Sequence, residues 1–463
     1  MLSFKRYLCA VSMLGLSAAA CAQQSPKPVT LRQLLTQVDQ KAPTLLTDSA
    51  AILIKRAQAI ETHNNWLPNL KLNYQADMGT ANNTAGPYFG FGIIPSSSGA
   101  IHATNVTTTI SDNLGIAAFD WEVYNFGSYA AQNKVANSDV DVQQNQFAQN
   151  KYNLQAFAII NYLQLLRLQD FVAIQQRNIQ RNQEIRRSIE SLAKSGVRAG
   201  VDTSIAEAEL SKARLDYIEL VNQQKQVQLQ LASVSGLPYT SIVGDTTAVQ
   251  KLIGSPQANV SNIDTANHPL INYYRSLRQN SIEREDMVRK MYNPKILVEG
   301  AAWGRGSSVD AAGNYNGLGS GYGFQRDNYL VGVGISYNLF DLKRKQLKLS
   351  TQRAETDYAG KKLDEQKQLL AITNGQADVE MQTAILRLHE IPHQLNAANA
   401  GYRQKLSLYR SGLTDIVELD AALQILYRAE TDYAQAKYAY TNALFQKAVS
   451  GNTVGTVLNL LNP

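Results

Sequence analysis

The motif His389-Glu390-Ile391-Pro392-His393 is the arrangement in this sequence that could do metal chemistry. It spells H-E-x-x-H, in which two histidines one helical turn apart bind zinc and the glutamate acts as a general base. That chemistry needs a regular helix, and Pro392 would kink the turn that carries the motif. The other histidines, His63, His102 and His268, all precede it. We therefore interpret the motif as a proline kink in a long helix and expect no enzyme, no metal site and no cofactor.

A second pattern, with Gly317, Gly319, Gly321 and Gly323 at alternate positions, resembles a phosphate-binding loop only superficially. A phosphate loop stands between a strand and a helix, whereas this segment stands between two expected strands. We interpret it as a flexible surface loop.

Composition excludes several classes of protein. Hydrophobic residues make up 44% and charged residues 18% of the 463 residues, as in ordinary globular proteins. The net charge of +6 is mild, and the basic residues are dispersed, so we expect no nucleic-acid partner. Beyond the first two dozen residues no run of 18 apolar residues occurs, so we expect no transmembrane helix in the mature chain.

The N-terminal segment 1–22 is typical of a secretory signal peptide. Lys5 and Arg6 precede an apolar stretch, and Ala20-Cys21-Ala22 fits an A-x-A cleavage site. Cleavage there would begin the mature chain at Gln23, and the alternative is lipidation of Cys21. Both cysteines, Cys9 and Cys21, lie in this segment, so the mature protein has no disulfide although it is exported.

The elements that must position any site come from an internal duplication. Segments 194–217 and 410–433 align without gaps at a shift of 216 residues, with eight identities in 24 positions. We expect two structural repeats, 23–236 and 268–463, joined by a Gly/Ser/Thr/Asn-rich linker at 237–267.

Each repeat has the same expected order: a helix, a β-hairpin and long helices. Helices are expected after Pro43 and Pro269, hairpins over 66–121 and 294–340, and long coiled-coil helices over 128–235 and 342–450. The first strand has clean alternation, with Leu70, Leu72, Tyr74, Ala76 and Met78 on one face.

Two features require several chains to assemble. A helix of nearly 70 residues would be about 100 Å long and needs parallel neighbours, as in a coiled-coil bundle or barrel. Four strands carrying Trp66, Trp121, Trp303 and Tyr337 near their ends suit an outer membrane, where aromatic girdles occur. Yet four strands cannot close a barrel, and lipid does not tolerate open sheet edges.

The sequence resembles the TolC-like outer-membrane efflux proteins over nearly all of the mature chain. The resemblance rests on the duplicated plan, on the junction Leu339-Phe340-Asp341, and on the Ser-Gly pairs near 195 and 411. It implies an α+β membrane protein: a homotrimer with a 12-stranded β-barrel in outer-membrane lipid and a long α-helical barrel in the periplasm. It also implies a passive channel-tunnel for tripartite efflux or type I secretion. The partners would be a periplasmic adaptor (membrane fusion) protein and an inner-membrane transporter of RND or ABC type.

The resemblance also implies a periplasmic gate at the helix turns. Glu418 matches the first position of an acidic pair that narrows the pore, whereas the second falls on Ala421, with Asp420 close by. Three copies of Glu418 would form a negative ring that selects cations. Asp202 and Tyr409 match tethering positions, but the matching basic position is Thr414, so Arg410 or Arg198 could hold the closed state instead. The tip turns Ser195, Gly196, Ser411 and Gly412 would contact the adaptor or transporter.

Two alternatives stay open at this stage. Asp202 and Glu418 could be no more than capping and first-turn acids, which the helix dipole favours. The whole protein could also be an exported coiled-coil scaffold or adhesin without a channel. The cargo is not encoded in any pattern that we recognise.

Overall fold

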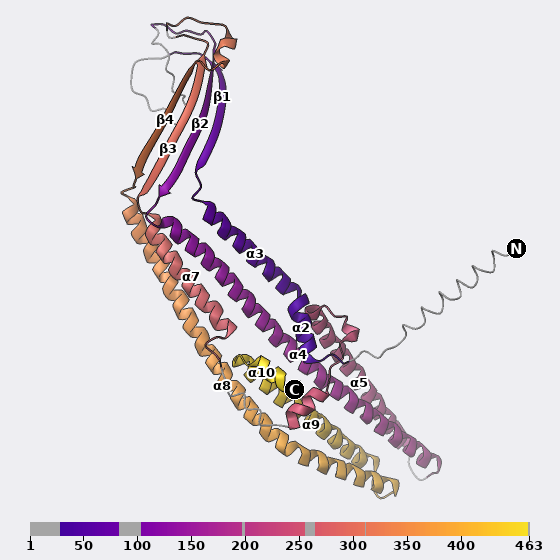
Figure 1. Ribbon diagram of the computed structural model, residues 1–463. Coiled ribbons are helices and arrows are strands. Elements are labelled where there is room, and N and C mark those ends of the chain that lie inside the picture. Colours follow the sequence, from indigo (N-terminus) through magenta and orange to yellow (C-terminus); the bar gives the residue numbers. More distant parts are fainter. Residues whose placement is uncertain (1–27, 83–102, 197–199, 255–263, 311, 462–463) are drawn as a thin grey trace, which may run out of the picture. The chain divides into compact units, whose positions relative to one another are not determined.

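The computed structural model describes residues 28–82, 103–196, 200–254, 264–310 and 312–461 (Figure 1). The expected signal peptide, Cys21 and Arg198 lie outside these residues. Two compact units are present: one contains Met1–Ile52, Val142–Ser276 and Lys361–Pro463, and the other contains Leu53–Asp141 and Leu277–Gly360. We refer to them as the helical unit and the strand unit and describe each by itself.

The same order of elements occurs twice along the chain. In the first half it is α3 (Pro43–Asn64), β1 (Asn69–Gly79), β2 (Ile110–Tyr124), α4 (Ser128–Lys194) and α5 (Gly200–Ser235). In the second half it is α7 (Pro269–Met291), β3 (Lys295–Ser307), β4 (Arg326–Ser336), α8 (Asp341–Arg410) and α9 (Ile416–Ser450).

The strand unit contains one antiparallel sheet in the order β1-β2-β3-β4 (Figure 1). Because side chains alternate along a strand and directly paired residues share a face, the register assigns every residue to one of two faces. We call one of them the apolar face. From β1 it contains Leu70, Leu72, Tyr74, Ala76 and Met78, and from β2 it contains Ser111, Asn113, Gly115, Ala117, Phe119 and Trp121. From β3 it contains Ile296, Val298, Gly300, Ala302, Gly304 and Gly306, and from β4 it contains Asp327, Tyr329, Val331, Val333 and Ile335.

The opposite, polar face carries most of the charged and amide side chains of the sheet, including Lys71, Asn73, Gln75, Asp77, Glu299, Arg305 and Asn328. All residues of β1 and β4 are solvent-exposed in the single chain, although nearly half of them are apolar. Trp303, which we expected in an aromatic girdle, pairs with Ile116. Its side chain therefore belongs to the polar face and not to the apolar face. Trp66 and Trp121 do lie together, and Trp121 Nε1 donates to the Trp66 carbonyl at 2.8 Å.

Strand bounds differ from the expected ones by a few residues. The first hairpin was expected to end at 121, and β2 continues to Tyr124. The second hairpin was expected to end at 340, and β4 ends at Ser336. Glycines 304 and 306 obscure the end of β3 in the sequence, because a residue without a side chain gives no sign of alternation.

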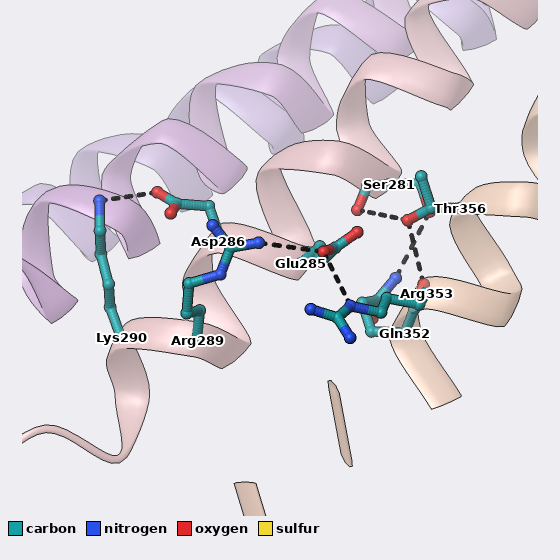
Figure 2. A network of polar contacts seen from close by, with 8 residues as sticks. All are labelled: Ser281, Glu285, Asp286, Arg289, Lys290, Gln352, Arg353 and Thr356. Atoms are coloured by element: carbon teal, nitrogen blue, oxygen red, sulfur yellow. Dashed lines mark hydrogen bonds and ion pairs between the residues drawn. The ribbon is translucent and has the colours of Figure 1, made fainter. Parts of the chain in front are cut away.

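Polar contacts fasten α7 to α8 within the strand unit (Figure 2). Ser281 Oγ lies 3.2 Å from Thr356 Oγ1, and Arg353 Nε lies 3.4 Å from Glu285 Oε1. Glu285 Oε1 also forms an ion pair with Arg289 Nη2 of the same helix, at 3.1 Å. These side chains therefore join α7 to this part of α8 by polar contacts.

The helical unit contains the main core. Its centre is a cluster from α4, α5 and α9 that includes Tyr162, Leu166, Leu231 and Phe445, all almost fully buried. Three further helices cover it: α2 (Leu31–Lys41), α6 (Thr247–Gly254) and α10 (Val454–Leu461). We did not expect these short helices, and α6 stands in the stretch expected to be a linker. They are too short for a periodic pattern to be distinctive, although Thr30 and Gln33 form a capping box before α2.

One long helix is apolar enough to be considered as a span. By length and composition alone, α4 contains an 18-residue stretch that could cross a membrane. We had expected no such stretch in the mature chain. Half of that stretch is buried inside the structure. A core helix of a globular unit passes the same test, and Tyr162, Leu165 and Leu166 of α4 are buried in the main core.

His268 sits at the start of α7 with its ring buried. Its Nδ1 accepts from the Leu270 N–H at 3.2 Å, and its Nε2 lies 3.1 Å from the Val449 carbonyl. These contacts fix the neutral tautomer with the proton on Nε2. Burial lowers the pKa of His268, partly opposed by the bond to Val449.

The expected kink at Pro392 does not interrupt α8. The helix is continuous from Asp341 to Arg410, and Pro392 lies inside it. The rings of His389 and His393 stand 6.4 Å apart. Among the described residues no group of three His, Cys, Asp or Glu side chains is placed to hold a metal ion.

Candidate functional site: the helix tips

The candidate site lies where α8 turns into α9 and where α4 turns into α5, in the helical unit. α8 ends in a Schellman motif: the Leu413 N–H donates to the Leu408 carbonyl at 2.9 Å and the Gly412 N–H donates to the Tyr409 carbonyl at 3.0 Å. Gly412 has φ +75°, which explains the glycine, since this left-handed conformation is costly for other residues. Gly196 follows α4 in the same way with φ +74°.

Asp415 begins α9 as its N-cap. Its Oδ1 accepts from the Glu418 N–H at 2.9 Å, which satisfies one of the unpaired donors at the helix start. α9 therefore starts at Ile416. Asp415 was missed, although its place three residues before a glutamate is a capping signal.

The Glu418 carboxylate is held by two side chains of the same chain. Its Oε2 accepts from Lys405 Nζ at 2.5 Å and from Thr414 Oγ1 at 2.7 Å. The bond from Lys405, followed by that from Thr414, lowers the pKa of Glu418. We call these three residues the Glu418 clasp. The cation is thus Lys405 on α8, which the sequence reasoning overlooked because Lys405 is 13 residues away.

Asp420 does not join the clasp. It faces α5, where burial raises its pKa first and the nearby Glu209 carboxylate raises it further. Gln424 also contacts this glutamate, because its Nε2 donates a hydrogen bond to Glu209 Oε2 at 3.4 Å. Asp420 is thus a half-buried acid beside another acid. It follows the exposed Glu418 by two residues, which is about half a helical turn, so the two carboxylates lie on roughly opposite sides of α9.

Tyr409 lies in a second hydrophobic cluster, which we call the tip cluster. It combines residues from α4, α5, α8 and α9: Ile185, Ile189, Ala206, Ala398, Tyr402, Tyr409, Ile416, Leu419, Leu423, Leu426 and Ala429. Tyr409 is only 1% exposed and Leu419 is 0% exposed. The cluster makes the two helical hairpins of one chain pack together near their ends.

Asp202 is in the first turn of α5 and is half-buried. Since α5 starts at Gly200, Asp202 lies inside the helix rather than capping it, which differs from the capping position proposed for it. Ser195 Oγ donates back to the Ser191 carbonyl at 2.7 Å, and Ser411 is exposed beside Gly412.

A bidentate ion pair links α4 to α9 next to the tip cluster. Arg181 donates from Nη1 and Nη2 to the two oxygens of Glu430, at 2.9 and 2.8 Å. The side chains are 22% and 13% exposed, and Arg177 approaches the same carboxylate at 3.8 Å. A more exposed pair, Arg186 with Glu207 at 2.6 Å, links α4 to α5. Sequence patterns cannot reveal such pairs, because 249 residues separate Arg181 from Glu430.

Comparison with known proteins identifies the family. A model described as outer membrane efflux protein matches residues 34–237 and 263–446. No curated protein sequence matches the chain at a significant level.

Solved structures share the fold. The outer-membrane channel OprN is 21% identical, with a TM-score of 0.69 over 91% of this chain and 89% of that one. The CmeC outer membrane channel of Campylobacter jejuni is 14% identical, with a TM-score of 0.72 over 93% and 89%. The outer membrane protein VceC of Vibrio cholerae is 14% identical, with a TM-score of 0.70 over 91% and 96%.

The family model covers far more than half of the chain. Its two blocks contain both hairpins, the helices α4, α5 and α8, and α9 up to residue 446. The TolC-like resemblance inferred from the duplicated plan is therefore confirmed. The chain belongs to the outer membrane efflux protein family, whose channels lie in the outer membrane with their helical part in the periplasm.

Proposed function

We propose that this protein is the passive exit duct of a tripartite efflux pump or type I secretion system. In this proposal three copies pool their strands into a 12-stranded barrel, and their long helices form a tunnel below it. A periplasmic adaptor and an inner-membrane transporter of RND or ABC type deliver the cargo, and the transporter selects it.

The observation that carries the proposal is the sheet of the strand unit. Its apolar face is exposed on β1 and β4. Among the described residues these two outer strands each pair with one neighbour, β2 and β3 respectively. Lipid does not tolerate unpaired backbone groups, so such a sheet can enter a membrane only if neighbouring copies pair with both edges. A strand of 11 residues rises about 37 Å, which at a tilt of about 40° spans roughly 28 Å, close to the apolar thickness of an outer membrane.

The second part of the proposal is a gate at the helix tips. Three copies of Glu418 would line a narrow ring. While the Glu418 clasp is closed, Lys405 would compensate the charge of each carboxylate and the Thr414 hydroxyl would donate a hydrogen bond to it. Release of the clasp on opening would uncover the negative ring and favour cations. In the same proposal Tyr409 and Asp202 hold the tips through packing and first-turn contacts, and Asp420 supplies a second acid. The turns at Ser195, Gly196, Ser411 and Gly412 are the surfaces offered to the adaptor or transporter.

Membrane fractionation and electrophoresis test the duct itself. We expect the protein in the outer-membrane fraction, as a trimer on unheated gels that becomes a monomer after boiling. A soluble periplasmic monomer would contradict the proposal and would revive the scaffold alternative.

Planar-bilayer recordings test the gate. We expect Glu418→Ala to reduce the preference for cations over anions, and Lys405→Ala to increase it. An unchanged preference in Glu418→Ala would remove Glu418 from the selectivity ring.

A further inference from the structure

Residues 318–324, which belong to the connection between β3 and β4, lie on the apolar face of the sheet. They contain the short helix η3 (Leu318–Tyr322), and we call residues 318–324 the cap. Ser111 Oγ donates to the Leu318 carbonyl, and Asn113 Nδ2 donates to the Tyr322 carbonyl at 2.8 Å. Both donors point from the apolar face and are buried, at 0% and 3% exposure. The cap is therefore fixed to that face by side chains of β2.

Three glycines of the apolar face make room for the cap. A Cβ added to Gly115 would stand 2.7 Å from the Phe324 ring, and one added to Gly304 would stand 3.0 Å from it. A Cβ added to Gly306 would come within 1.9 Å of the Gly323 carbonyl oxygen, which is backbone and cannot step aside. We call the space above these three glycines the notch. The cap can pack this closely on the sheet only because residues 115, 304 and 306 have no side chains.

Phe324 fills this notch. Its ring meets Tyr74 edge to face, with the ring centroids 6.3 Å apart. Gln325 Nε2 donates to the Ser320 and Ser307 carbonyls, both at 3.0 Å, and so ties the cap back to the end of β3. The glycine-rich segment expected to be a flexible surface loop thus has defined packing.

The outer surface of the cap is apolar. Leu318, Tyr322 and Phe324 are 41%, 42% and 57% exposed. They continue the exposed apolar face formed by Leu72, Tyr74, Tyr329 and Val331, while the backbone carbonyls beneath them are bonded to Ser111 and Asn113. Aromatic side chains with a polar tip are typical of the level where headgroups meet acyl chains.

We infer that the cap is a lipid-contacting surface that sits in the boundary between headgroups and acyl chains of the membrane. This inference rests on the proposed barrel, in which the apolar face meets lipid. The cap lies at the end of the strands, which is the rim of the apolar band. It extends the lipid-facing wall beyond the strands. It also keeps this connection on the outside of the wall, so that it does not cover the opening of the channel.

Fluorescence quenching of single-cysteine variants tests the inference, because the native cysteines, Cys9 and Cys21, lie in the N-terminal segment and can be replaced. Tyr322→Cys, Val331→Cys and Asn328→Cys are labelled with an environment-sensitive fluorophore and reconstituted into phosphatidylcholine vesicles containing nitroxide lipid. Val331 reports the apolar face and Asn328 the polar face of the same strand. We expect lipid quenching at 322 and 331, and quenching only by aqueous iodide at 328.

The outcomes separate this inference from the proposed function. Lipid quenching at 331 together with iodide-only quenching at 322 would overturn the lipid-contacting cap and leave the barrel intact. Absence of lipid quenching at 331 would overturn both.

Gly306→Ala tests the notch, with Gly334→Ala as the matched control because a Cβ at Gly334 meets nothing within 4 Å. We expect Gly306→Ala to abolish lipid quenching at 322 but to keep it at 331, which also shows that the variant has folded. Phe324→Ala is a second variant that removes the ring from the notch without adding a clash. Unchanged quenching at 322 in both variants would refute the packing that we assign to the cap.

Discussion

Replacement of Glu430 by alanine should loosen the helix tips by a calculable amount. The change removes both oxygens that accept the bidentate pair from Arg181 at 2.8 and 2.9 Å, and it leaves a guanidinium that is only 22% exposed without its anion. Breaking a fully buried pair from one side costs about 3–5 kcal/mol, and partial exposure reduces this to about 2–3 kcal/mol. The unfolding of α4 and α9 around the pair should therefore become easier.

Native-state hydrogen exchange measures this loss directly. In the regime where exchange reports the free energy of local opening, about 2–3 kcal/mol corresponds to roughly 30- to 160-fold faster exchange of the protected amides near Arg181 and Glu430. Glu207→Ala is the matched control, since its partner Arg186 and Glu207 itself are both well exposed, and we expect a much smaller change there.

A double variant separates charge from packing. Arg181→Met with Glu430→Leu removes both charges and keeps the volume, so we expect exchange to return close to the native rate. Unchanged exchange in Glu430→Ala, or an equal loss in the double variant, would refute the reasoning that an unpaired charge weakens the tips.

Three further predictions follow from the helical unit. Leu419→Ala should destabilise the tip cluster by about 2–5 kcal/mol because Leu419 is fully buried, whereas Leu413→Ala, at 75% exposure, should have little effect in the same urea titration. Because the pKa of Glu418 is lowered, its bond to Lys405 contributes fully above the ordinary value of 4.5 and is lost as the pH falls through the lowered pKa. Channel recordings from pH 7 to below the lowered pKa of Glu418 should show more open time at the acidic end, and Lys405→Ala should show that increase already at pH 7. Burial lowers the pKa of His268, so the contribution of the neutral ring to stability is present above pH 6.5 and is lost as the pH falls through the lowered pKa. His268→Gln should therefore flatten the dependence of the unfolding free energy on pH below 6.5. An unaltered pH dependence would contradict this account.

The architecture could be predicted because it is periodic and repeated. Three features of the sequence correspond to observed elements: the absence of proline from 128–235, the alternation from Leu70 to Met78, and the 216-residue shift. The short helices α2, α6 and α10 could not be predicted, since eight to eleven residues that pack on a core have no distinctive period.

The site was harder to predict because its chemistry depends on distant partners. Glu418 was identified by resemblance, but its cation, Lys405, lies on the preceding helix, and its pairing follows from how α8 and α9 pack. The same holds for Asp420, whose neighbour Glu209 is on α5. The sequence gives no reason for the glycines at 115, 304 and 306, and only their contacts with residues 323 and 324 explain them.

Disulfide cross-linking between the outer strands tests the central claim most directly. One cysteine is placed at Asn73 of β1 and a second is moved along the polar face of β4 through positions 328, 330, 332 and 334, with the native cysteines replaced. A closed barrel predicts that at least one position gives covalent dimers and trimers on non-reducing gels, and that no band exceeds the trimer. Monomers at every position, or a ladder extending beyond three chains, would contradict a trimer that pools its strands.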